Sequence, residues 1–122
     1  MDERRRRGDR GEEAVAAALE RRGYCVLERQ VRCRWGEIDL IARDPAGVLC
    51  FVEVKSRAGT RFSAPREAVT PAKQRRLRSA AEWYLARTGL EESLCRFDVA
   101  EVWPSRSGGW DRPNLNYIIN AF

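Results

Sequence analysis

Charged side chains interrupt two apolar segments of the chain, where charge is costly to bury. Asp39 lies in the run GEIDLIA, and Glu53 and Lys55 lie in the run FVEVKSR. Alternate residues of a strand share a face, so Lys55 would lie ~6.6 Å along the strand from Glu53 on the same side. Two neighbouring carboxylates repel each other, and a divalent cation removes that repulsion. Oxygen ligands favour Mg²⁺ or Mn²⁺, and Lys55 could orient or deprotonate a water bound there beside a phosphate.

The same residues also fit a purely structural role. Asp39 could pair with Lys55, and Glu53 with an arginine, as ion pairs that join neighbouring strands. Both explanations stay open on these residues alone. The basic residues favour a special role for Lys55, because 21 of the 23 are arginine and only Lys55 and Lys73 are lysine. The pKa of a desolvated lysine changes far more readily than that of arginine.

A hairpin over residues 36–57 would position these groups. Two apolar runs flank the turn-forming segment Asp-Pro-Ala-Gly. Strand alternation predicts that Glu37 and Asp39 share one face of the first strand. It places Ile38, Leu40 and Ala42 together on the other face.

An alanine-rich helix is predicted over residues 11–22, with Gly23 ending it. Val15, Ala16 and Leu19 would face the core. Glu12 shares that face, whereas Glu13 points toward solvent. The simpler role for Glu12 is a carboxylate that complements the helix N-terminus.

A second helix begins with Thr70 as N-cap and Pro71 in the first turn, and runs to about Thr88 before Gly89. Lys73 lies one turn before the core stripe and points inward or to its rim. The stripe comprises Leu77, Ala80, Ala81 and Tyr84. Arg75, Arg76 and Arg78 form an outer basic face, which is either simply solvated or a track for phosphates.

Further strands are predicted at residues 24–34, 94–102 and 115–122, with loops at 58–65 and 104–109. The element order is αβββαββ, an α/β domain with a central mixed sheet flanked by helices. We expect one domain over residues 11–122, preceded by a basic N-terminal arm over residues 1–10.

The composition limits the possible functions. The chain of 122 residues has a net charge of +5, which favours a polyanionic partner such as nucleic acid. It contains no histidine, which excludes a histidine base or ligand. No long apolar run or signal peptide is evident, so we expect a cytoplasmic protein without a membrane segment. Four cysteines without Cys-x-x-Cys spacing are expected to be buried, reduced thiols.

The motifs in combination resemble a known family. The chain is similar to the PD-(D/E)XK nuclease superfamily in three features. A helix bears Glu12, a strand bears Asp39, and the next strand contains Val-Glu-Val-Lys. The closest resemblance is to the bacterial YraN family of nuclease-like proteins. It rests on GEEAVAAAL, GEIDLIA, FVEVKSR, PREAV, RFDV and the final NAF, and covers nearly the whole chain. Gln30 stands where that family usually has asparagine, and Tyr117 where it often has histidine. Both positions lie outside the proposed metal shell, so the two differences affect substrate contacts.

The resemblance implies a restriction-endonuclease-like fold and a role for each charged residue. Asp39, Glu53 and the carbonyl of Val54 would bind Mg²⁺ or Mn²⁺, with Glu12 binding directly or through water. Lys55 would position the attacking water, and Lys73 would lie near the scissile phosphate. Glu37 would be an accessory ligand or the partner of an arginine.

The implied activity is metal-dependent hydrolysis of phosphodiester bonds in DNA, with branched or single-stranded DNA as candidate substrates and a homodimer as one option. A rival function is a nucleic-acid-binding adaptor that keeps the fold but turns over little. A third is a protein-interaction module that uses residues 117–122 as a pairing edge. The expected nucleic-acid contacts are Arg57, Arg61, Arg75, Arg76 and Arg78.

Overall fold

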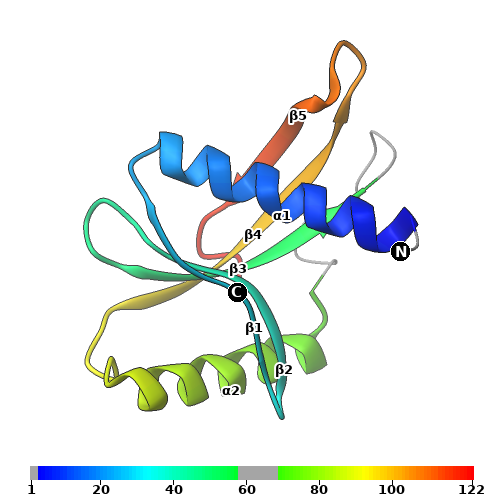
Figure 1. Ribbon diagram of the computed structural model, residues 1–122. Coiled ribbons are helices and arrows are strands. Elements are labelled where there is room, and N and C mark those ends of the chain that lie inside the picture. Colours follow the sequence, from blue (N-terminus) through cyan, green and yellow to red (C-terminus); the bar gives the residue numbers. More distant parts are fainter. Residues whose placement is uncertain (1–2, 58–68) are drawn as a thin grey trace.

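The helices and strands follow the predicted order αβββαββ (Figure 1). The computed structural model describes residues 3–57 and 69–122, with side chains from residue 9 onward. The elements are α1 (Glu3–Arg21), β1 (Cys25–Cys33), β2 (Gly36–Arg43), β3 (Leu49–Ser56), α2 (Pro71–Thr88), β4 (Cys95–Ser105) and β5 (Gly109–Ile118). No helix in these ranges is long and apolar enough to cross a membrane.

The strands form one mixed sheet in the order β1-β2-β3-β4-β5. Neighbouring strands are antiparallel except β3 and β4, which run parallel. A parallel pair requires a crossover, and α2 lies in the connection between these two strands. The predicted hairpin is therefore confirmed as β2 and β3, at the centre of the sheet.

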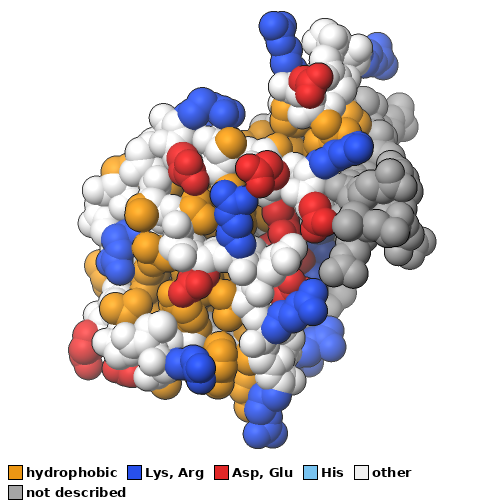
Figure 2. Space-filling view, viewed as in Figure 1, with side chains coloured by type: hydrophobic (Ala, Val, Ile, Leu, Met, Phe, Trp, Pro, Cys, Tyr) orange, Lys and Arg blue, Asp and Glu red, His pale blue; other side chains and the backbone are white. Residues whose placement is uncertain are grey.

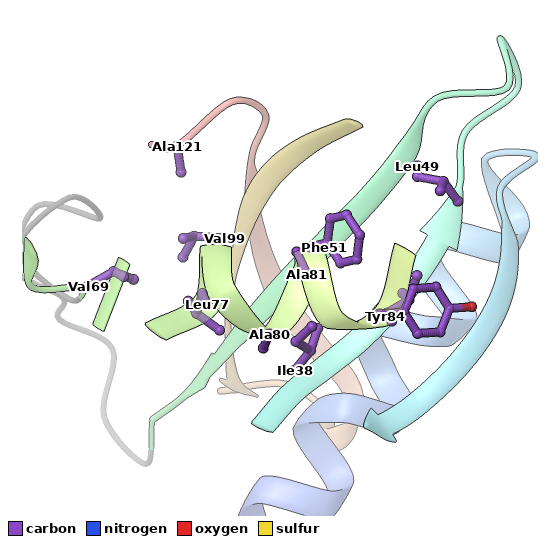
Figure 3. Packing of buried hydrophobic residues seen from close by; sticks show 11 residues of the cluster. Ile38, Leu49, Phe51, Val69, Leu77, Ala80, Ala81, Tyr84, Val99 and Ala121 are labelled. Carbon is purple, nitrogen blue, oxygen red and sulfur yellow. The ribbon is translucent and has the colours of Figure 1, made fainter. Parts of the chain in front are cut away.

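The two helices cover opposite faces of the sheet (Figure 1). On the α1 face, Val15 and Leu19 pack against residues such as Val52. On the α2 face, the predicted stripe packs around Phe51 and Ile38 (Figure 3). Alternate residues of β3 therefore enter different cores, which explains why this strand is apolar on both faces.

The ends of α2 lie where the sequence places them. Thr70 has extended backbone geometry, and its hydroxyl accepts a hydrogen bond from the Lys73 N–H. Pro71 begins the helix, and Gly89 ends it in the left-handed conformation. The predicted core residues Leu77, Ala80, Ala81 and Tyr84 are all buried.

Other predicted boundaries are wrong. Helix α1 begins at Glu3 instead of residue 11, because arginine and glutamate are good helix formers and extend the alanine-rich segment backward. Strand β5 runs over Gly109–Ile118 instead of 115–122. It contains Pro113, which lacks a backbone N–H. An edge strand such as β5 tolerates proline, because one of its sides has no neighbouring strand that requires a donor. Residues 119–122 are therefore not strand, which removes most of the pairing edge expected for a protein-interaction module.

Burial of the cysteines also differs from the prediction. All four are free thiols, but only Cys50 is buried, whereas Cys25 and Cys95 are exposed. Cys25 lies in the edge strand β1, and Cys95 begins β4, so both lie at the margin of the sheet. Burial raises the pKa of Cys50 to about 12, which keeps it an unreactive thiol.

A buried ionic network joins β4 and β5 to the residues that flank β1 and β2. Asp98 is fully buried and accepts hydrogen bonds from Arg96 Nε at 3.1 Å and from Tyr117 Oη at 2.6 Å. Arg96 also donates to Asp44 at 2.6 Å and to Tyr24 at 2.8 Å. Such a network stabilises the fold only when each polar group has a partner, as here.

Candidate active site

The candidate site forms where β2 and β3 separate. Their ladder ends at the pair Leu40 and Val52, so the next residues, Asp39 and Glu53, no longer pair through the backbone. The N–H of Val54, left without a strand partner on this side, donates to Asp39 Oδ2 at 2.7 Å. The carboxylate of Asp39 thus replaces a backbone acceptor.

The break also changes which faces the β2 residues occupy. Ile38 joins the core beneath α2, whereas Leu40 and Ala42 join the core beneath α1. The prediction that these three side chains share one face is wrong for Ile38, because regular alternation fails at Asp39. The irregularity places Asp39 in the gap between the strands.

The neighbouring carboxylates repel a negative charge on Asp39. The pKa of Asp39 is raised to about 8, first by burial and then by the negative charge of Glu53, against the opposing effect of the Val54 N–H. Glu12 and Glu37 add smaller contributions in the same direction. Two carboxyl groups held this way do not ionise together easily unless a cation lies between them.

Two lysines surround the other carboxylate. Glu53 is 5 % exposed, and its Oε1 lies 2.6 Å from Lys73 Nζ and 3.6 Å from Lys55 Nζ. Among the described residues, the ion pairs differ from the structural alternative, in which Lys55 pairs with Asp39 and Glu53 with an arginine: both lysines pair with Glu53. Glu53 and Lys55 share a face, as predicted, and Lys73 reaches them from the first turn of α2.

The two ammonium groups differ in their electrostatic surroundings. Burial lowers the pKa of Lys55, and the charge of Lys73 lowers it further against the attraction of Glu53. Burial alone would also lower the pKa of Lys73, but its hydrogen bond to Glu53 raises it overall. Lys73 is therefore the firm counter-ion of Glu53, and Lys55 is the lysine better suited to exchange a proton.

Helix α1 contributes Glu12 at the margin of the gap. Burial raises the pKa of Glu12, partly offset by a hydrogen bond from Gln30 Nε2 to Glu12 Oε2 at 2.8 Å. Gln30 has a left-handed backbone conformation, with φ of 52°. Gly11 lets α1 lie close to β3, because a Cβ there would lie 2.9 Å from the Ser56 Cβ. Gln30 thus holds Glu12, a long-range contact that its position in the sequence did not indicate, and its expected effect on substrate contacts stays a prediction.

A pocket of about 250 Å³ opens onto these groups. Its lining comprises Trp35, Gly36, Glu37, Asp39, Glu53, Lys73, Arg76 and Leu77. Figure 2 shows acidic side chains near the middle of this face, with Lys and Arg side chains below them toward the tip of the β1–β2 hairpin. Glu37 lies 3.6 Å from Arg32 Nε, which is the arginine partner foreseen for it.

The arginines predicted to contact nucleic acid lie in different surroundings. Arg76 lines the pocket, and Arg75 is exposed on α2. The Arg78 guanidinium lies over the rings of Phe97 and Phe122, 5.0 and 5.6 Å from their centroids, so it also covers the core. Arg57 is exposed just after β3. Arg61 lies outside the described residues.

The donor chemistry fits a hard divalent cation. Asp39, Glu53 and the Val54 carbonyl are all oxygen donors, and the repulsion felt by Asp39 is of the kind that a cation relieves. In residues 3–57 and 69–122, however, no three Asp, Glu or Cys side chains form a group that could hold a metal. The fit is therefore to two carboxylates and a carbonyl, with Glu12 close enough to Asp39 to affect its pKa.

A larger hollow, of about 970 Å³, lies between α1 and β5. Its charged side chains are all exposed, so none has lost its hydration. Buried, mutually repelling charges mark functional sites better than volume does. The smaller pocket at Asp39 and Glu53 is therefore the candidate active site.

Comparisons with known proteins place the chain among closely similar bacterial proteins. Residues 11–102 match the model described as "Uncharacterised protein family UPF0102". The UPF0102 protein STH1475 of Symbiobacterium thermophilum is 55% identical over 118 residues, 97% of each chain. A UPF0102 protein of Ralstonia pickettii is 48% identical over 118 residues, 94% of this chain and 88% of that protein. One of Pelobacter propionicus is 43% identical over 119 residues, 97% of this chain and 83% of that protein.

Proposed function

We propose that this chain, which belongs to the UPF0102 family, is a metal-dependent nuclease that hydrolyses phosphodiester bonds in DNA. Its fold would then be that of the PD-(D/E)XK superfamily, which the sequence motifs resemble. The observation that carries the proposal is the break between β2 and β3. It brings two carboxylates into one pocket beside Lys73 and Arg76, and Lys55, whose pKa burial lowers, lies 3.6 Å from Glu53 Oε1.

The ligand set follows from the strand geometry. The N–H and C=O of one strand residue point to the same side, and the Val54 N–H points to Asp39. The Val54 carbonyl therefore faces the same gap and joins Asp39 and Glu53 as a ligand of Mg²⁺ or Mn²⁺. Glu12, held by Gln30, would complete the set directly or through water.

Each basic residue has a distinct task in this mechanism. A bound divalent cation supplies a water of lowered pKa and neutralises charge on the phosphate. Lys55, whose pKa burial lowers, would orient the attacking water and, in its neutral amine form, accept the proton of that water. Lys73 and Arg76 line the pocket and hold the phosphate by charge. By resemblance, the products carry 5′-phosphate and 3′-hydroxyl ends.

Calorimetric titration with Mn²⁺, at a pH above the raised pKa of Asp39, tests the metal site. We expect saturable binding by the wild type and none by Asp39→Asn. Glu13→Gln is the matched control, because Glu13 is an exposed carboxylate paired with Arg29 outside the pocket, and it should bind normally. Cleavage of labelled single-stranded and branched DNA should be lost in Glu53→Gln. A wild type that binds no Mn²⁺, even with a non-cleavable oligonucleotide, would refute the proposal.

A second candidate function is a nucleic-acid-binding adaptor with little turnover. The observation favouring it is the short contact of Lys73 with Glu53, because a carboxylate already neutralised by lysine needs no metal to be stable. Salt-sensitive DNA binding that survives both Glu53→Ala and Lys55→Ala, without any cleavage by the wild type, would support the adaptor.

A further inference from the structure

An exposed tryptophan stands at the mouth of the candidate site. Trp35 is 41% exposed and lines the pocket together with Asp39 and Glu53. It belongs to the tight turn that joins β1 and β2, where Cys33 pairs with Gly36. Such turns favour glycine, asparagine and aspartate, so folding gives no reason for a large aromatic residue here.

Arginine side chains accompany the ring. The Arg34 guanidinium lies 4.7 Å from the centroid of the Trp35 ring, a cation–π arrangement that also places positive charge beside it. Arg76 lines the same pocket from α2. Figure 2 shows Lys and Arg side chains gathered at the tip of the β1–β2 hairpin. The Trp35 ring and Arg76 therefore line the same pocket as the carboxylates, and Arg34 lies over the ring.

An aromatic ring flanked by arginines binds nucleobases by stacking. Bases within a duplex are already stacked on their neighbours, so only an unpaired or extruded base could use such a ring. We propose that Trp35 is a stacking platform for an unpaired nucleobase, adjacent to the phosphate that the pocket receives. The substrate class is therefore nucleic acid with a single-stranded segment, such as a single strand, flap or frayed junction. This inference rests on the proposed nuclease function and specifies its substrate.

Binding measured in EDTA, where no metal-dependent cleavage can occur, tests the platform. Fluorescence anisotropy would compare a labelled single-stranded oligonucleotide with a duplex of the same sequence. Trp35→Ala should weaken single-strand binding by about 5- to 150-fold, whereas Trp35→Phe, which keeps an aromatic face, should stay within about threefold. Duplex binding should change little in either variant. Leu94→Ala is the control, because Leu94 is a 77% exposed apolar side chain outside the pocket.

The outcomes separate this inference from the proposed function. Equal weakening of single-strand and duplex binding by Trp35→Ala, or no weakening of either, would overturn the platform alone, with Mn²⁺ binding at Asp39 still intact. Wild-type protein that binds neither form at low salt would overturn the platform and the nuclease together. Circular dichroism spectra that match the wild type verify that the variants fold.

Discussion

The ion pair between Lys73 and Glu53 would compete with the binding of a metal ion to Glu53. Its ammonium group lies 2.6 Å from Glu53 Oε1, closer than Lys55 at 3.6 Å. A cation that binds this carboxylate must displace the contact and then tolerate a nearby positive charge. Lys73→Met, which keeps the apolar stem but removes the charge, should therefore increase the affinity for Mn²⁺.

The expected gain follows from the contact that is lost. A charge-assisted hydrogen bond contributes about 1.5–3 kcal/mol, so metal affinity should rise by about 10- to 100-fold. The metal-free variant should be less stable, because a 5% exposed carboxylate loses its closest partner. Lys73 is itself 34% exposed, and Lys55 remains nearby, so we expect a loss of about 1–3 kcal/mol instead of the larger cost of a fully buried pair.

Two assays measure these opposing effects. Calorimetry gives the affinity for Mn²⁺, and thermal melting with and without saturating Mn²⁺ gives the stabilisation by the metal, which should be larger in Lys73→Met than in the wild type. Arg75→Met is the matched control, because it removes an exposed positive charge from the same helix outside the pocket. Equal or weaker Mn²⁺ binding by Lys73→Met would refute the competition between lysine and metal.

Two further predictions concern the framework of the site. Gly11→Ala places a Cβ 2.9 Å from the Ser56 Cβ, so α1 must shift. We expect a loss of about 1–3 kcal/mol in the free energy of unfolding and weaker Mn²⁺ binding. Wild-type values of both quantities would contradict this expectation. In the buried network, Tyr117→Phe removes one hydrogen bond to Asp98 and should cost about 1–3 kcal/mol, whereas Arg96→Met leaves that charge without its cation and should cost about 3–5 kcal/mol. Urea unfolding measures both, and equal costs would show that Arg96 is not the main counter-ion.

Features set by local sequence were predictable. The start of α2 depends on Thr70 and Pro71, and its end on Gly89, and each acts through neighbouring backbone groups. The turn between β2 and β3 depends on Asp44, whose Oδ1 accepts hydrogen bonds from the N–H groups of Ala46 and Val48. Because these interactions span four residues or fewer, the residue types alone determine them.

Features set by contacts between distant segments were not predictable. The inward direction of Lys73 followed from helical spacing, but its pairing with Glu53 depends on how α2 packs across the sheet. Asp98 gave a signal, as a charged residue in the apolar strand LCRFDVAEV, yet two of its three partners, Tyr117 and the Asn120 N–H, lie about twenty residues further along the chain. The face occupied by Ile38 depends on where two strands separate, which a rule of regular alternation does not contain.

The structural and metal-binding interpretations of Glu53 are compatible once Lys73 is placed. A buried carboxylate without a counter-ion would destabilise the fold whenever metal is absent. The ammonium of Lys73 supplies that counter-ion from a flexible, partly exposed stem, so it can leave without disturbing the core. Among the described residues no lysine or arginine forms an ion pair with Asp39, and its raised pKa favours the protonated form. In the proposed function, a divalent cation would replace the lysine at Glu53 and the proton that the raised pKa of Asp39 favours.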